Sequence, residues 1–304
     1  MPNRQRDVVF VHGINSKGPE TFDQMRDAMV AGGRDPGRLS IYSYDYTDSL
    51  RTNGAMLATY LRDRRSDDVA LVCHSMGGLV ARLAVLENDL PFVKTIVMLA
   101  TPNFGAMQDG QLGVLMQPIV QAGRALMGWR PRKQGILDLT RVPKIFEAVF
   151  DAGHDTTEID YVTIPGTFFH ELRNSWEMPD RELKAAFFTA LSIGTQIGAA
   201  LYPLFSANLG RPHDGIVTER SNAFAPLVAG YDAEKNASIN RPHGPSTYAH
   251  VRPRVSRKLH HCNITHNAEI IALVDSLVDA PSLAAWLAAL APADYSNYTI
   301  VPLV

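Results

Sequence analysis

The chain has 304 residues, of which 46% are hydrophobic and 20% charged. This is enough apolar sequence for a substantial folded core, and the length excludes a short disulfide scaffold. The 29 Lys and Arg residues nearly balance the 31 Asp and Glu residues, which leaves a formal charge of -2. Because no global attraction to phosphate backbones follows from this balance, we do not expect nucleic acid as a partner.

The cysteine content and the start of the chain bear on the compartment. Cys73 and Cys262 are too few for a disulfide framework and are compatible with a reducing compartment. Residues 1–7 are polar and run directly into an apolar stretch at 8–11, which leaves no room for the succession of segments in a signal peptide. We therefore predict a cytoplasmic protein.

The first third of the chain alternates strand and helix patterns. Apolar and β-branched runs predict strands at 8–11, 39–44, 69–73 and 93–100. Helical periodicity with exposed charges predicts helices at 20–31, 49–65 and 76–88. A succession of this kind is typical of a parallel sheet that is covered by helices on both faces.

The alternation breaks after Thr101 and Pro102. The pattern predicts helices at 112–126 and 143–150, a strand at 161–165 and a long uncharged helical stretch between Lys184 and Arg211. Residues 223–257, with four prolines, predict an irregular surface loop, followed by helices at 267–278 and 281–290 and a terminal strand at 298–301. We therefore expect one α/β domain over residues 1–304, with a mostly parallel central sheet and helical insertions at 103–159 and 168–210.

The uncharged stretch between Lys184 and Arg211 also suggests a membrane span, because it contains a GxxxG pattern at Gly194 and Gly198. Gln196 and Pro203 weigh against it. We expect no transmembrane span, and only contact with a membrane surface stays compatible with the pattern.

The strongest functional signal is the segment His74-Ser75-Met76-Gly77-Gly78, which follows a predicted strand and opens a predicted helix. A serine on such a turn projects its hydroxyl above the carboxyl edge of the sheet, where the helix N-terminus favours developing negative charge. The pattern departs from G-x-S-x-G because Cys73 takes the place of the first glycine. The alternative is that Ser75 merely caps the helix.

A second motif, Phe10-Val11-His12-Gly13-Ile14, ends the first predicted strand. Together the two motifs resemble the α/β-hydrolase superfamily, and within it the lipases and esterases with an HG oxyanion signature. The resemblance is best supported over residues 7–105, since the segment that starts at Ala100-Thr101-Pro102 is also similar. It implies that the backbone N–H groups of Ile14 and Met76 form an oxyanion hole.

A serine nucleophile needs a general base, which a third group must orient. The superfamily order places an acid and then a histidine after the serine. Asp214, which precedes Gly215, resembles the acid segment of bacterial lipases, whereas Asp160 begins a predicted strand and so lies at the opposite edge of the sheet. Glu171 and Glu177 are weaker candidates in a polar loop.

Five histidines follow the acid candidate, and His266 directly precedes a predicted apolar-periodic helix. We predict His266 as the base, with His261 and His260 as the next candidates. These three histidines with Cys262 could instead form a zinc cluster, although paired ligand spacings are missing.

The resemblance further implies that the two insertions form a helical lid over an acyl pocket; the alternative is that their helices pack on the sheet. We predict an esterase or lipase, a serine hydrolase that cleaves small-molecule or lipid esters through an acyl-enzyme on Ser75, without a cofactor or metal. An acyltransferase with the same triad is one alternative. A catalytically silent lipid-binding protein is the other.

Overall fold

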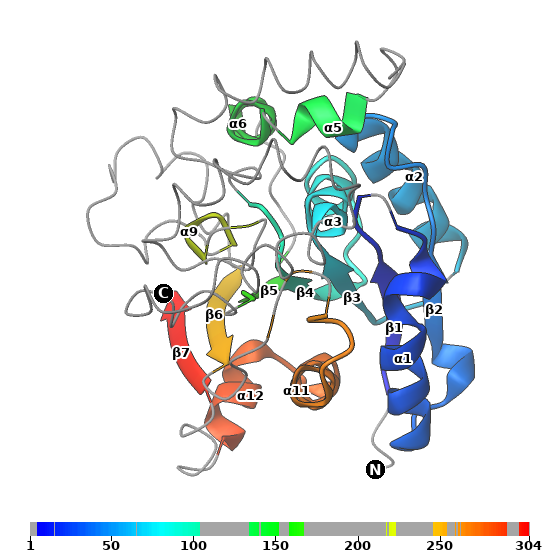
Figure 1. Cartoon of the computed structure of the whole chain (residues 1–304), viewed down its shortest axis with the longest axis vertical. Coiled ribbons are helices and arrows are strands. Elements are labelled where there is room, and N and C mark those ends of the chain that lie inside the picture. The colour runs from blue at the N-terminus through cyan, green and yellow to red at the C-terminus, as the bar shows by residue number, and fades with distance from the viewer. Residues whose placement is uncertain are drawn as a thin grey trace, which may run out of the picture.

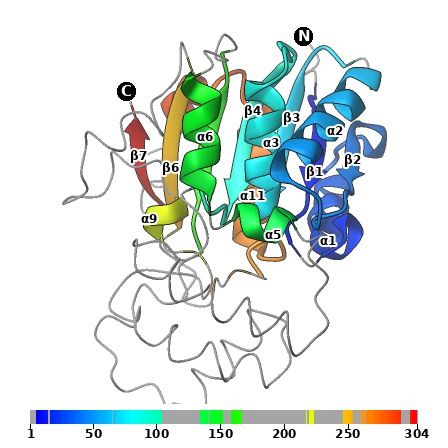
Figure 2. The same cartoon turned by 90° about the horizontal axis from the view of Figure 1, so that it is seen from above.

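The structure is a computed structural model of the chain. It describes residues 5–14, 16–64, 66–103, 134–139, 141–151, 158–166, 217, 219–222, 246–253, 259, 261, 263–290 and 298–303. Within these residues a seven-stranded sheet has the order β2-β1-β3-β4-β5-β6-β7, in which Figure 1 labels every strand; Figure 2 shows the sheet from above, with β2 and β7 at its two edges. The strands are β1 (Asp7–Val11), β2 (Leu39–Tyr42), β3 (Val69–His74), β4 (Val93–Leu99), β5 (Asp160–Ile164), β6 (Thr247–Pro253) and β7 (Tyr298–Leu303). All pairs are parallel except β6 with β7.

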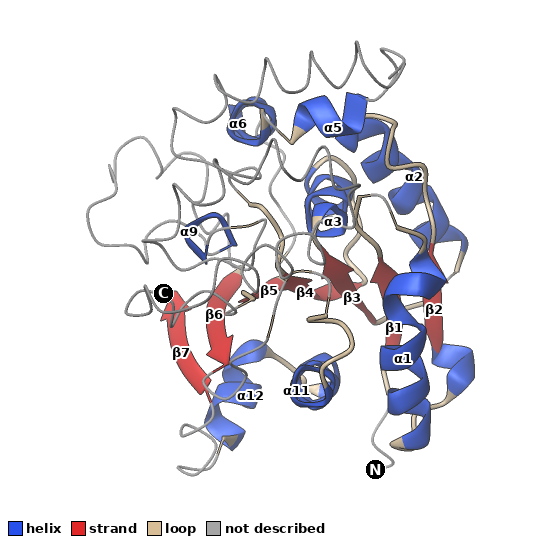
Figure 3. Ribbon diagram, viewed as in Figure 1, coloured by secondary structure: helices blue, strands red, loops and turns tan. Residues whose placement is uncertain are grey.

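Helices cover both faces of this sheet (Figures 1 and 3). One layer contains α2 (Leu50–Asp63), α3 (Met76–Leu86), α5 (Gln134–Asp138) and α6 (Val142–Asp151), and the other contains α1 (Gly18–Ala31), α11 (Ala268–Asp279) and α12 (Leu283–Ala289). A 3₁₀ turn (Pro36–Arg38) and the short α9 (Glu219–Asn222) complete the described helices. Buried hydrophobic side chains form one cluster on each face, so the predicted sheet with two helical layers is confirmed.

Polar side chains define where several of these helices begin. The Ser49 side chain accepts a hydrogen bond from the Thr52 N–H, and Ser282 does the same for Ala285. Asn267 accepts from both Glu269 and Ile270 at the start of α11. These caps satisfy N–H groups that have no partner inside the helix, which is why the predicted helices begin within two residues of their expected positions.

The described part of the first insertion packs in the core. Residues 142–151 form α6, as the sequence predicts, and Val142, Phe146 and Val149 are at most 1% exposed in the cluster that also contains α2 and α3. The apolar face of this helix is therefore part of the core on that side of the sheet. The rest of both insertions lies almost wholly outside the described residues, and with it the uncharged stretch between Lys184 and Arg211.

The prediction of an irregular loop over 223–257 is wrong for its last part, which forms β6. His250, Arg252 and Pro253 interrupt the apolar alternation that would mark a strand. The structure accommodates His250 in the core through a hydrogen bond of 2.8 Å between its Nδ1 and the Thr163 hydroxyl on β5. His250 can therefore be buried in the strand because its hydrogen bond is satisfied by the neighbouring strand. The sequence has no apolar residue at this position that would have predicted the strand.

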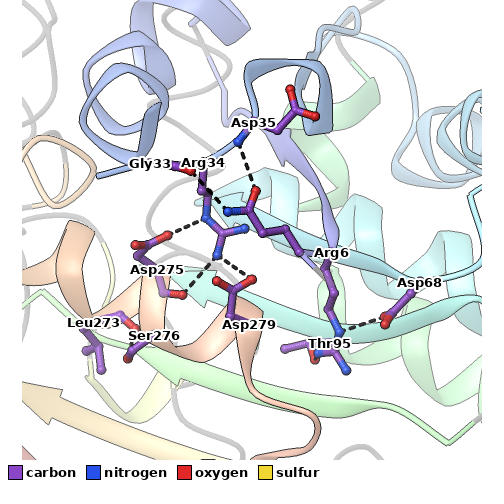
Figure 4. Close-up of polar contacts among 11 residues, drawn as sticks. Arg6, Gly33, Arg34, Asp35, Asp68, Thr95, Leu273, Asp275, Ser276 and Asp279 are labelled. Carbon is purple, nitrogen blue, oxygen red and sulfur yellow. Dashed lines mark hydrogen bonds and ion pairs between the residues drawn. The ribbon is translucent and has the colours of Figure 1, made fainter. Parts of the chain in front are cut away.

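Two buried arginines make ion pairs, one within the layer of α1 and α11 and one at the amino edge of the sheet (Figure 4). Arg34, just after α1, pairs with Asp275 and with Asp279 of α11, the latter at 2.9 Å. Arg6 pairs with Asp68 at 2.7 Å and donates to the Thr95 hydroxyl at 3.0 Å. Because Arg6 precedes β1 and Thr95 is near the start of β4, the Arg6 contacts lie at the amino edge of the sheet, opposite to Ser75.

None of the described helices is both long and apolar enough to cross a lipid bilayer.

Candidate active site

Ser75 occupies a strained turn between β3 and α3. Its φ of 53° and ψ of -126° lie in a region that a residue with a side chain rarely adopts. The Ser75 N–H donates to the Leu99 carbonyl at 2.9 Å, and the Ser75 carbonyl accepts from the Gly78 N–H at 3.2 Å. These two backbone bonds hold the side chain at the carboxyl edge of the sheet, as expected for a nucleophile elbow.

Glycines allow the end of β1 to contact this turn directly. A Cβ on Gly13 would lie 2.7 Å from the Ser75 Cβ, and a Cβ on Gly77 would lie 2.3 Å from the Val11 carbonyl oxygen and 2.4 Å from that of His12. Contacts this short exclude any side chain at either glycine. The structure therefore brings the two sequence motifs, the HG pair and the serine turn, into contact.

Tyr44 and the His12 side chain shape the HG turn. Tyr44 donates its backbone N–H to His12 Nε2 at 3.2 Å and its hydroxyl to the His12 carbonyl at 2.8 Å, and the two rings stack at 4.4 Å. His12 Nδ1 lies 2.8 Å from the Gly13 carbonyl oxygen. Since a carbonyl only accepts and an N–H only donates, the neutral tautomer with hydrogen on Nδ1 satisfies both contacts. The Tyr44 contribution carries no sequence signature and was not predicted.

The His12 environment predicts an acid-sensitive stability. Burial lowers the pKa of His12, so below about pH 6.5 the unfolded chain takes up a proton that the folded chain resists. The free energy of unfolding contributed by this site is therefore present above that pH and is lost as the pH falls through the folded pKa. We expect Tm to fall more between pH 7 and pH 5 in the wild type than in His12→Gln, which cannot titrate. Equal slopes in thermal melts at matched buffers would contradict this.

The predicted oxyanion donors are the backbone N–H groups of Ile14 and Met76, one from each motif. Met76 is the first residue of α3 and is buried, whereas Ile14 is half-buried. Among the contacts that the described part of the chain makes, neither N–H donates to a protein acceptor. The Met76 N–H, directly after the serine and at a helix N-terminus, is the type of donor that stabilises an oxyanion.

The histidine that contacts the serine is His261. Its Nε2 lies 2.9 Å from the Ser75 Oγ, and its side chain is buried in the turn before α11. The predicted base, His266, lies five residues further on, in a turn where its carbonyl accepts from the Gln24 side chain at 3.1 Å. The structure thus pairs Ser75 with the second candidate instead of His266, because a further turn at 263–266 separates the histidine beside the nucleophile from the helix.

The predicted acid, Asp214, lies outside the described residues, as do His260 and Cys262 of the suggested zinc cluster. Asp160, the rejected acid, begins β5, and its carboxylate accepts from the Leu283 N–H at 2.7 Å. It therefore lies at the amino edge of the sheet, away from Ser75, as predicted.

Cys73 is the departure from the glycine motif, and it has no role as a competing nucleophile. Its side chain is fully buried in β3, and burial raises the pKa of the thiol well above its ordinary value. Only the thiolate is strongly nucleophilic. The small cysteine side chain thus occupies the glycine position as a core residue.

A buried polar network fixes the loop after β4. Arg82 of α3 donates to Asn103 at 3.0 Å, the Asn103 side chain donates to the Asn222 carbonyl at 2.7 Å, and the Asn222 side chain donates back to the Thr101 carbonyl at 3.2 Å. The guanidinium also lies 3.9 Å from the centre of the Phe146 ring. Burial lowers the pKa of Arg82 to about 10, so it stays charged at neutral pH. The network, which sequence patterns did not reveal, links α9 to the edge where Ser75 lies.

Comparisons with known proteins agree with this architecture. A family model described as a domain of unknown function (DUF7379) matches residues 1–133, and no curated protein sequence matches the chain. The mature lipase BlEst2 of Bacillus licheniformis is similar with a TM-score of 0.56 and 20% identity, over 91% of this chain and 93% of that one. Phospholipase PlaB from Legionella pneumophila is similar with a TM-score of 0.51 and 13% identity, over 92% of this chain and 61% of PlaB. At these identities the likeness establishes the fold, which is the predicted α/β-hydrolase fold.

Proposed function

We propose that this chain is a serine hydrolase that cleaves carboxylic esters, as an esterase or lipase, through an acyl-enzyme on Ser75. The observation that carries the proposal is the 2.9 Å contact between the Ser75 Oγ and His261 Nε2 on a strained strand-to-helix turn. A hydroxyl becomes an effective nucleophile when a base within hydrogen-bond reach removes its proton. A serine that only capped α3 would accept a backbone N–H, and the Ser75 side chain makes no such cap bond.

In the proposed reaction, the Ser75 oxygen attacks the ester carbonyl while its proton passes to His261 Nε2. The oxyanion of the tetrahedral intermediate accepts hydrogen bonds from the Ile14 and Met76 N–H groups, and each such donor is worth about 2.7 to 4 kcal/mol. His261 then protonates the leaving alcohol, and water attacks the acyl-enzyme with His261 again as the base. The bond between the acyl carbon and the Ser75 oxygen then breaks, the proton on His261 returns to that oxygen, and the carboxylic acid is released.

The decisive experiment uses an activated probe. Purified protein is treated with a fluorophosphonate, and the modified peptide is mapped by mass spectrometry, alongside hydrolysis of p-nitrophenyl acetate and butyrate. We expect one adduct per chain, on Ser75, at the rate at which esterase activity is lost. A protein that binds fatty acyl ligands yet neither reacts with the probe nor hydrolyses the esters would be the silent lipid-binding protein instead.

Acyl transfer is a second outcome of the same chemistry, because only the acceptor that deacylates Ser75 differs. Product analysis with an added alcohol separates the two. We also propose a helical cap over the acyl side of the site. It would consist of residues 168–210 and of the part of 103–159 outside α5 and α6, and the proposal rests on their sequence pattern.

Asp214 is the proposed acid that orients His261, on its resemblance to the acid segment of lipases. We expect Asp214→Asn to lower kcat by about 10²- to 10⁴-fold while fluorophosphonate labelling slows in parallel, because an asparagine does not stabilise the imidazolium. The matched control is Asp160→Asn, which removes an acid at the opposite edge of the sheet. An unchanged kcat in Asp214→Asn with a large loss in Asp160→Asn would reverse the assignment.

A further inference from the structure

His74 lies between the nucleophile and the turn that carries the base. It is the last residue of β3, its side chain is 8% exposed, and its Nε2 lies 2.8 Å from the main-chain carbonyl oxygen of His261. The two imidazole rings are 4.9 Å apart at 51°. Because a carbonyl oxygen can only accept, the hydrogen of this bond belongs to His74 Nε2.

This hydrogen bond completes a ring of contacts that links His74, Ser75 and His261. His74 is covalently joined to Ser75, and the Ser75 Oγ contacts the His261 side chain. The His261 carbonyl in turn accepts a hydrogen bond from the His74 side chain. Ser75 and His261 are 186 residues apart in the sequence, so no local chain geometry fixes their separation. The hydrogen bond from His74 to the main-chain carbonyl of His261 restrains the backbone that carries the His261 side chain.

On the premise of the proposed function, we infer that His74 is a positioning residue for the base: it holds the main chain of His261 so that Nε2 stays within reach of the Ser75 hydroxyl. His74 neither attacks nor transfers a proton in this role. Small displacements of a reacting group cost large factors in rate, so a hydrogen bond that fixes the base acts on kcat. A His74 that only filled space in the core would act on stability alone.

A pair of substitutions separates the hydrogen bond from the volume of the side chain. His74→Gln keeps an N–H donor near the position of Nε2, whereas His74→Met has a similar length and no donor. We expect kcat for p-nitrophenyl acetate to fall about three- to tenfold in His74→Met, the range of one ordinary hydrogen bond, and to stay within about twofold of wild type in His74→Gln. KM should be unchanged in both variants, because His74 does not contact the substrate in this assignment.

Rates must be expressed per active site. Fluorophosphonate titration counts the functional sites in each preparation, so partial misfolding does not imitate a lower kcat. The structural control is Thr95→Val, which removes a buried hydrogen bond to Arg6 at the amino edge of the sheet (Figure 4). We expect it to lower Tm and to leave kcat per titrated site unchanged.

The outcomes distinguish this inference from its premise. If the wild type is neither labelled nor active, the proposed function fails. If the wild type is labelled at Ser75 and both His74 variants keep the wild-type kcat per site, or lose it equally, the positioning role is overturned and the function stands. A loss confined to His74→Met, with rescue by glutamine, supports the role.

Discussion

Replacement of Ser75 by alanine is expected to lower kcat for p-nitrophenyl esters by about 10⁶-fold, because it removes the attacking oxygen and leaves no group to take its place. The fluorophosphonate adduct should disappear at the same time. Ser75 is buried beside His261, and the alanine retains the Cβ that contacts Gly13, so the fold should not change. Initial rates and intact-mass labelling of the purified variant measure both effects.

Ser75→Gly provides the control for stability. Glycine removes the hydroxyl and also tolerates the φ of 53°, a conformation that costs other residues about 1–3 kcal/mol. We therefore expect Ser75→Gly to be as inactive as Ser75→Ala and to melt at an equal or higher temperature. An active Ser75→Ala protein, free of wild-type contamination, would refute the acyl-enzyme mechanism.

Much of the sheet and the nucleophile turn could be predicted because their signals are local. Continuous apolar runs such as that around Val72, followed by glycines at positions 77 and 78, specify a buried strand and a close helix approach within a dozen residues. β6 could not be predicted in the same way, since His250 is accommodated by Thr163, a partner 87 residues away. A polar side chain whose hydrogen bond is made to a neighbouring strand adds nothing to the hydrophobic pattern along its own strand, which is the pattern that predicts a strand.

The base illustrates the same limit at the site. The rule that a catalytic histidine directly precedes the closing helix favoured His266, because the helix signal from Asn267 onward is strong. The turn at 263–266 between His261 and that helix has no distinctive composition. What marks His261 in the structure is the contact of 2.9 Å between its Nε2 and the Ser75 Oγ, which joins residues 186 positions apart in the sequence.

His261→Ala is expected to lower kcat by about 10⁴- to 10⁶-fold, whereas His266→Ala should stay within about threefold of wild type. The reason is the 2.9 Å contact that His261, and not His266, makes with the Ser75 hydroxyl. Because alanine keeps the main-chain carbonyl at position 261, the bond from His74 survives, so the loss reports the imidazole and not the anchoring of the turn.

The two variants should be compared at equal Tm and with fluorophosphonate labelling as a second readout. Labelling needs an activated serine, so His261→Ala should react slowly and His266→Ala at nearly the wild-type rate. A crippled His266→Ala beside an active His261→Ala would mean that the turn before α11 rearranges during turnover to present a different imidazole. The contact between His261 and Ser75 would then describe a resting arrangement, and the positioning role of His74 would fall with it.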